Sequence, residues 1–132
     1  MIAPRPLSLL AELTYRCNLQ CPYCYNPLDL GAYRDELGVE TWERVLEEAA
    51  ALGVLQAHFS GGEPTLRADD VCRLTRKARL LGLYTNLITQ GTFLTDGLIA
   101  QLEDAGLDHV QLSLQAARGH GADAIAGATV HE

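Results

Sequence analysis

The stretch Cys17-Asn18-Leu19-Gln20-Cys21-Pro22-Tyr23-Cys24 contains three of the four cysteines of this 132-residue chain. Three residues separate the first two cysteines and two separate the second pair, in a segment with little to bury. A tetrahedral zinc site or a fully ligated iron–sulfur cluster needs four protein donors, so three thiols leave one coordination position open. The spacing therefore predicts a metal site at which a small molecule can also bind.

The apolar run at residues 7–13, directly before the cysteines, is typical of a strand. Apolar spacing, caps and glycine stops predict this order: a strand at 8–14, a helix from Thr41 to Gly53, a strand at 56–60, a helix from Asp69 to Gly82, a strand at 84–89, a helix from Thr95 to Gly106, a strand at 110–115 and a helix near 123–126. Such alternation indicates an α/β fold with parallel strands and crossover helices. Enzymes of this architecture have their catalytic residues at the carboxyl ends of the strands, and the cysteines follow the end of a predicted strand here.

Polar and apolar residues alternate in two of the expected strands. Ala57 and Phe59 oppose Gln56, His58 and Ser60, while Val110, Leu112 and Leu114 oppose Gln111, Ser113 and Gln115. Because helices must cover the apolar face, we expect the polar row to line a cleft or a barrel interior. The alternative is a sheet with one face in water.

A second motif, Ser60-Gly61-Gly62-Glu63-Pro64, follows one expected strand and precedes a helix. Its glycines allow backbone groups to approach a ligand, and Glu63 offers a carboxylate to an ammonium group. A phosphate-binding loop would end in Lys-Ser/Thr, which this motif lacks. An incidental turn is the other interpretation.

The cysteine spacing, with aromatic Tyr23 directly before Cys24, resembles the CxxxCxΦC signature of the radical S-adenosylmethionine (SAM) superfamily, and Gly61 to Pro64 resembles its GGEP motif. Residues 10–27 and 83–115 resemble the PqqA peptide cyclases, the family of pyrroloquinoline quinone (PQQ) synthesis protein E. The resemblance covers essentially the whole chain, but only the amino-terminal part of that family. It implies that residues 1–132, after an irregular lead-in at 1–6, form the first three to four units of a partial (βα) barrel of the radical SAM type. The rest of the barrel and the auxiliary-cluster domain would be absent, leaving a sheet edge unpaired.

The resemblance also assigns roles to residues. It implies that Cys17, Cys21 and Cys24 hold a [4Fe-4S] cluster whose fourth iron binds SAM. The residues expected to contact SAM are Tyr23, Ser60, Gly61, Gly62, Glu63, Pro64, Ser113 and Gln115. Weaker candidates are Asn86, Thr89 and Gln90 at the end of one strand, with His58 and Glu12 on the polar row. His58 is more often a satisfied histidine than a ligand.

The implied activity is reductive cleavage of SAM to a 5′-deoxyadenosyl radical. By resemblance, this radical starts a carbon–carbon cross-link between a glutamate and a tyrosine of the peptide PqqA in PQQ biosynthesis. The implied partners are the carrier protein PqqD and an electron donor such as flavodoxin. The alternatives are a radical SAM enzyme that modifies another peptide and a non-catalytic metal-binding module. In the latter, Cys72 would complete a structural zinc site, although its place in an apolar helical stripe favours a buried thiol.

Charge and composition narrow the partners and the compartment. A formal net charge of −7 and a pI near 5.0 argue against nucleic acid as the main partner. The sequence contains no run of 18 apolar residues, so it predicts no membrane-spanning helix. Clustered cysteines without an apolar leader favour metal binding in the reducing cytoplasm over disulfides.

Overall fold

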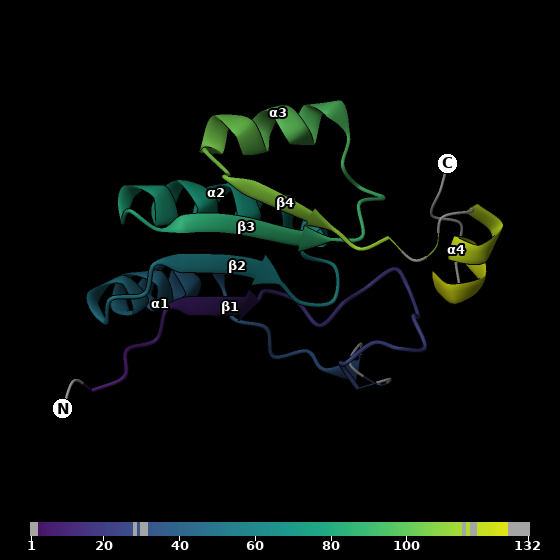
Figure 1. The fold of residues 1–132 in the computed structure, drawn as a ribbon, viewed down its shortest axis with the longest axis horizontal. Helices are drawn as coiled ribbons and strands as arrows, with labels where there is room; N and C mark the ends of the chain where they lie inside the picture. The colour runs from purple at the N-terminus through teal and green to yellow at the C-terminus, as the bar shows by residue number, and fades with distance from the viewer. Residues whose placement is uncertain (1–2, 28, 30–31, 115, 117–118, 127–132) are drawn as a thin grey trace.

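A computed structural model of the chain describes residues 3–27, 29, 32–114, 116 and 119–126. Its elements, in chain order, are β1 (Ser8–Glu12), α1 (Val39–Ala51), β2 (Gln56–Ser60), the 3-10 helix η2 (Pro64–Arg67), α2 (Ala68–Leu80), β3 (Tyr84–Thr89), α3 (Asp96–Ala105), β4 (His109–Leu112) and α4 (Gly119–Ala126). The four strands form one parallel sheet in the order β1-β2-β3-β4 (Figure 1). The open sheet confirms the predicted α/β class, because parallel neighbours require the crossover helices that the sequence indicated.

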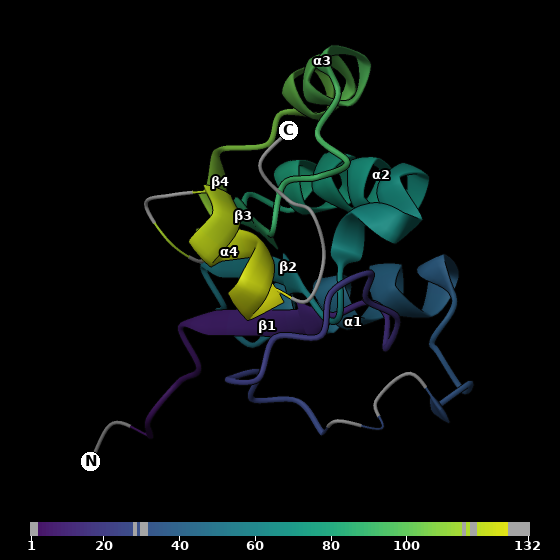
Figure 2. The same cartoon turned by 90° about the vertical axis from the view of Figure 1, so that its right-hand side faces the viewer.

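Helices α1, α2 and α3 all lie on one side of the sheet (Figure 2). Ala57, Phe59 and Leu87 point to this side and are fully buried, with 0% of their surface exposed. They belong to one core cluster that also includes Leu46 of α1 and Leu74 of α2. The apolar face of the alternating pattern therefore carries the core, and the other face of the sheet is left without a layer of helices among the described residues.

The predicted strand bounds are right at the centre of the sheet and too long at its edges. Strands β2 and β3 have the expected bounds, whereas β1 ends at Glu12 and β4 at Leu112. Beyond these points single backbone bonds remain, from Leu13 N–H to the Ser60 carbonyl (2.9 Å) and from Ser113 N–H to the Thr89 carbonyl (3.0 Å). The edge strands are shorter because each has one neighbour to bond.

Helix caps follow the sequence in one case and depart from it in another. Thr95 caps α3, accepting a hydrogen bond from Leu98 N–H, and Gly106 ends it at φ 86°. The expected cap Thr41 is wrong: it lies inside α1, and Gly38 in extended conformation is the N-cap. Thr41 N–H already donates to the Gly38 carbonyl, so the helix begins earlier than a side-chain cap would place it.

Coverage of the last strand is the main departure from the sequence analysis. Val110 and Leu112 were expected beneath a helix, but they are 40% and 51% exposed. Helix α3 packs mainly against α2, and its Ile99 is 49% exposed. Strand β4 forms one edge of the described sheet. In the part of the chain described, no helix is both long and apolar enough to span a membrane.

Candidate functional site

A cavity of about 190 Å³ lies at the carboxyl ends of the strands. Parallel strands bring their carboxyl ends to one edge, so loops distant in sequence meet there. The residues that line it are Cys17, Leu19, Cys21, Tyr23, Cys24, Tyr25, Asn26, Ser60, Gly61, Gly62, Glu63, Ile88, Thr89, Gln90 and Ser113. The structure thus brings the cysteine and glycine motifs and Ser113 to one cavity. Pro64 is buried and does not line the cavity, and Gln115 lies outside the described residues.

The three cysteines line this cavity without meeting at one point. Cys17 and Cys24 are exposed and Cys21 is half-buried. A turn through Pro22 and Tyr23, closed by Cys24 N–H to the Cys21 carbonyl (3.1 Å), shapes the loop. Within residues 3–27, 29, 32–114, 116 and 119–126, no three His, Cys, Asp or Glu side chains converge as one metal ion would require.

This donor set fits an iron–sulfur cluster better than a single zinc ion. A cluster binds each cysteine to a different iron atom, so its ligands need not converge on one point. A zinc site needs a fourth donor at the same centre. Cys72, the proposed fourth donor, is 4% exposed within the core cluster, which confirms that it is a buried thiol of α2.

The Cys17 thiol has a raised pKa although the residue is exposed. Its sulfur is partly shielded from water, which raises the pKa, and the charges of Glu63, Cys21 and Cys24 raise it further, against the hydrogen bond from Leu19 N–H to its Sγ (3.4 Å). Because a metal binds the thiolate, metal binding here must release a proton.

The two glycines of the second motif lie against the chain that leads into the cysteine loop. A Cβ on Gly62 would lie 2.0 Å from the Arg16 carbonyl oxygen, and a Cβ on Gly61 would lie 2.6 Å from that of Thr14. The Gly62 and Glu63 amides donate to these same two carbonyls at 2.7 Å. The absence of a Cβ at Gly61 and Gly62 therefore lets the backbone of Thr14 and Arg16 pack closely against them, in addition to their place in the cavity lining. The sequence did not indicate this packing role.

The Glu63 carboxylate is 1% exposed and already bonded. It accepts hydrogen bonds from Thr65 N–H (3.1 Å), the Thr65 hydroxyl, the Thr89 hydroxyl (2.6 Å) and Gln90 N–H (3.0 Å). These contacts fix the glycine motif to the end of β3. A contact between this carboxylate and an ammonium group stays a prediction.

The polar row on the open face has its own hydrogen bonds. His58 Nε2 lies 3.2 Å from Gln56 Oε1, and Asn86 Nδ2 lies 3.1 Å from His58 Nδ1. His58 is thus a satisfied histidine, as expected. The Asn86 Oδ1 atom is buried and has no hydrogen-bond partner among the described residues.

Residues 11–131 match the family model of the radical SAM superfamily. The chain belongs to the radical SAM superfamily. The resemblance carried by Cys17 to Cys24 and Gly61 to Pro64 is therefore confirmed.

The radical SAM chain is similar to longer curated proteins. A PqqA peptide cyclase of Xanthomonas euvesicatoria pv. vesicatoria is 56% identical over 126 residues, which are 96% of this chain and 34% of the relative. A PqqA peptide cyclase of Methylobacterium nodulans is 57% identical over 124 residues, which are 94% of this chain and 32% of the relative. The chain thus spans about a third of the length of these relatives.

Solved structures share the fold of this radical SAM chain. Streptococcus suis SuiB bound to S-adenosylmethionine superposes with a TM-score of 0.76 at 25% identity, over 96% of this chain and 27% of SuiB. SuiB bound to its precursor peptide SuiA gives a TM-score of 0.74 at 27% identity, over 95% of this chain and 28% of SuiB. These similarities support the partial (βα) barrel of the radical SAM type.

Two residues next to the cysteines make contacts that the sequence did not indicate. The Tyr25 hydroxyl donates to Glu12 Oε1, and burial together with this carboxylate raises the pKa of Tyr25. Asn18 Nδ2 donates to Thr92 Oγ1 (3.1 Å), tying the cysteine loop to the turn after β3. Position beside a cysteine was the only sequence signal for Tyr25 and Asn18.

Proposed function

We propose that residues 1–132 form the N-terminal portion of the core domain of a radical SAM enzyme. In this proposal Cys17, Cys21 and Cys24 ligate a [4Fe-4S] cluster, and SAM occupies the open coordination position. The observation that carries it is that three thiols share one cavity with the glycine motif at the carboxyl edge of a parallel sheet, and no histidine or fourth cysteine is among the described residues that line this cavity. The SAM-bound relative SuiB supports SAM as the ligand.

A bound cluster supplies the electron for reductive cleavage of SAM, while the chain binds, orients and shields the reactants. The thiols of the three cysteines give up their protons to become ligands. The backbone of Gly61 and Gly62 forms part of the cavity wall, held in place by the bonded Glu63 carboxylate. We propose that Tyr23, Ser60, Pro64, Ser113 and Gln115 complete the SAM site, as the family resemblance implies.

For the whole protein we propose cross-linking of a glutamate and a tyrosine in PqqA, with PqqD as carrier and an electron donor such as flavodoxin. The supporting observation is the 56% identity to a PqqA peptide cyclase over nearly the whole chain. The likeness to SuiB bound to its precursor peptide SuiA supports the wider class of peptide substrates and favours, as the second candidate, modification of another peptide.

The test uses the whole protein that contains these residues, loaded with iron and sulfide in the absence of oxygen, reduced and given SAM. We expect 5′-deoxyadenosine to form, and PqqA presented with PqqD to lose two hydrogen atoms by mass, as a new carbon–carbon bond requires. 5′-Deoxyadenosine without a change in PqqA would support another peptide. One zinc per chain and no SAM cleavage would contradict the proposal.

A further inference from the structure

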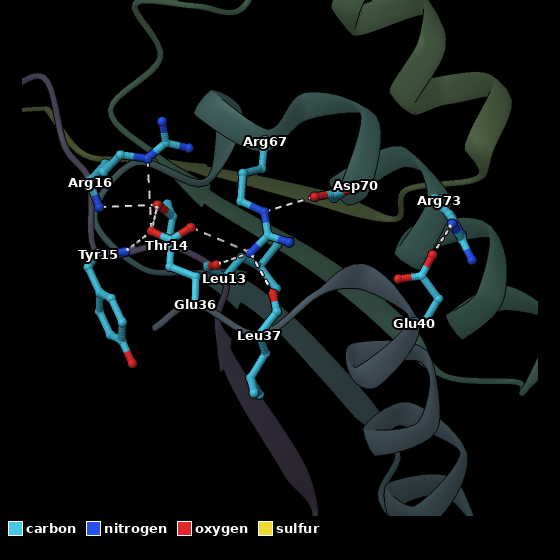
Figure 3. A network of polar contacts seen from close by, with 10 residues as sticks. All are labelled: Leu13, Thr14, Tyr15, Arg16, Glu36, Leu37, Glu40, Arg67, Asp70 and Arg73. Atoms are coloured by element: carbon cyan, nitrogen blue, oxygen red, sulfur yellow. Dashed lines mark hydrogen bonds and ion pairs between the residues drawn. The ribbon is translucent and has the colours of Figure 1, made fainter. Parts of the chain in front are cut away.

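Glu36 and Arg67 lie where the two ends of the cysteine loop come together (Figure 3). This loop connects β1 to α1 and carries Cys17, Cys21 and Cys24. Tyr15 lies before these cysteines, and Glu36 lies after them, 21 positions from Tyr15. Figure 3 shows both charged side chains pointing into the space between these two ends. Glu36, Arg67 and the backbone groups that they contact are together called the loop clamp.

Glu36 reaches from the end of the loop to its start. Its Oε1 accepts hydrogen bonds from the Thr14 hydroxyl (2.5 Å) and from Tyr15 N–H (2.9 Å). Its carboxylate also lies 3.9 Å from Arg16 Nε and 3.8 Å from Arg67 Nη1. The two hydrogen bonds are short and the ion pairs long, so the hydrogen bonds are the stronger contacts.

Arg67 joins the same two segments from the other side. Its Nη1 donates to the Leu13 carbonyl, before the loop, and to the Leu37 carbonyl, after it (3.0 Å). Its Nε donates to Asp70 Oδ2 (2.8 Å), which fixes the guanidinium to the first turn of α2. A planar fork with several donors can make these contacts together, whereas a lysine ammonium on a flexible stem cannot replace its geometry.

The loop clamp is more buried than the neighbouring ion pair of Arg73 and Glu40. The side chains of Arg67 and Glu36 are 12% and 19% exposed, whereas Arg73 and Glu40, the separate pair in Figure 3, are 47% and 73% exposed. Contacts shielded from water are screened less and hold their geometry better than exposed pairs. The loop clamp is thus suited to fixing a position.

The fixed position is next to the first cysteine. The clamp holds Leu13 to Tyr15, and the glycine motif holds the Thr14 and Arg16 carbonyls from the other side. We propose that Glu36 and Arg67 are positioning residues for the cysteine site: they close the base of the loop so that Cys17 Sγ keeps its place at the cavity. The relevance of this positioning to catalysis rests on the proposed function, whereas the closure of the loop base by Glu36 and Arg67 does not depend on it.

The first test is amide hydrogen exchange on the metal-free full chain. Glu36→Gln keeps the shape of the side chain and one acceptor but removes the charge, so we expect exchange at Tyr15 N–H to be about fivefold faster. Leu19 N–H, which donates to Cys17 Sγ, should also exchange faster, because it reports whether that sulfur stays in place. The matched control is Glu43→Gln, because Glu43 is also partly buried, at 24% exposed, and its removed charge faces Arg73 of α2, away from the cysteine loop.

The second test follows loss of iron to a chelator after loading, with the unfolding midpoint measured in parallel. We expect Glu36→Gln and Arg67→Lys to lose iron about fivefold faster than wild type and Glu43→Gln to match wild type. Arg67→Lys keeps the positive charge, so a shared effect would identify the geometry of the clamp as the cause.

Two results would overturn the proposal: faster exchange at Tyr15 with no change at Leu19, which would indicate a local structural role, or Glu36→Gln behaving as Glu43→Gln in both tests. Faster exchange at both amides supports the loop clamp even if the wild-type chain, once loaded, fails to cleave SAM. That failure would instead overturn the proposed function, so the two can be told apart.

Discussion

The two faces of the sheet differ in what their side chains do. On the face beneath α1, α2 and α3, Ala57, Phe59 and Leu87 are fully buried in the core. On the opposite face, His58 and Asn86 bond to each other, and the strands lead to the cavity of the cysteines. Apolar burial therefore stabilises one face, and polar contacts shape the other. Stability and chemistry can therefore be disturbed separately in this chain.

The largest effect on stability is expected on the helix-covered face. Phe59→Ala removes a fully buried aromatic ring, which should lower the free energy of unfolding by about 3–5 kcal/mol. Urea unfolding of the full chain measures this. A loss comparable to that of His58→Ala on the open face would contradict the division between the faces.

A smaller effect on stability is expected at the carboxyl end of β2, where the glycine motif contacts the cysteine loop. Gly62→Ala forces its Cβ against the Arg16 carbonyl, which should cost about 1–3 kcal/mol of stability and weaken SAM binding. Gly97→Ala is the matched control, because its Cβ would have no neighbour nearer than 3.9 Å and Gly97 lies in helix α3. Unfolding and equilibrium SAM binding measure both variants, and equal behaviour would contradict a close backbone approach at Gly62.

The smallest effect concerns the pH dependence of the loop clamp. Burial raises the pKa of Glu36, but hydrogen bonds from Thr14 and Tyr15 and the charges of Arg16 and Arg67 outweigh it, so the pKa lies below its usual 4.5. A lowered pKa means that the carboxylate stabilises the fold above the unfolded-state value, and that this is lost as pH falls through the folded-state value. Glu36→Gln should therefore be less stable than wild type at pH 7 by about 1–2 kcal/mol, and the gap should close in acid. A gap that is independent of pH would contradict this assignment.

Much of the fold could be predicted from the sequence because its signals are local. The alternation of polar and apolar residues predicts β2, and the spacing of apolar residues between Thr95 and Gly106 predicts α3. The exposure of Val110 could not be predicted, because it depends on α3 packing against α2 and leaving β4 at the edge.

The candidate site was predictable only where chemistry shows in residue type. Three clustered thiols and a glycine pair stand out in any chain. Glu36 and Arg67 do not, since their role depends on two chain segments meeting in space. The bonded state of Glu63 likewise depends on the register that brings Thr89 to it.

The most direct test of the central claim is the iron and sulfide content of the full chain after anaerobic loading, in two cysteine variants. Changing Cys17, Cys21 and Cys24 to alanine should abolish loading, because no other thiol lines the cavity in the part of the chain described. Cys72→Ala should load as wild type does, because Cys72 lies in the core. Full loading of the triple variant, or loss of loading in Cys72→Ala, would contradict the account.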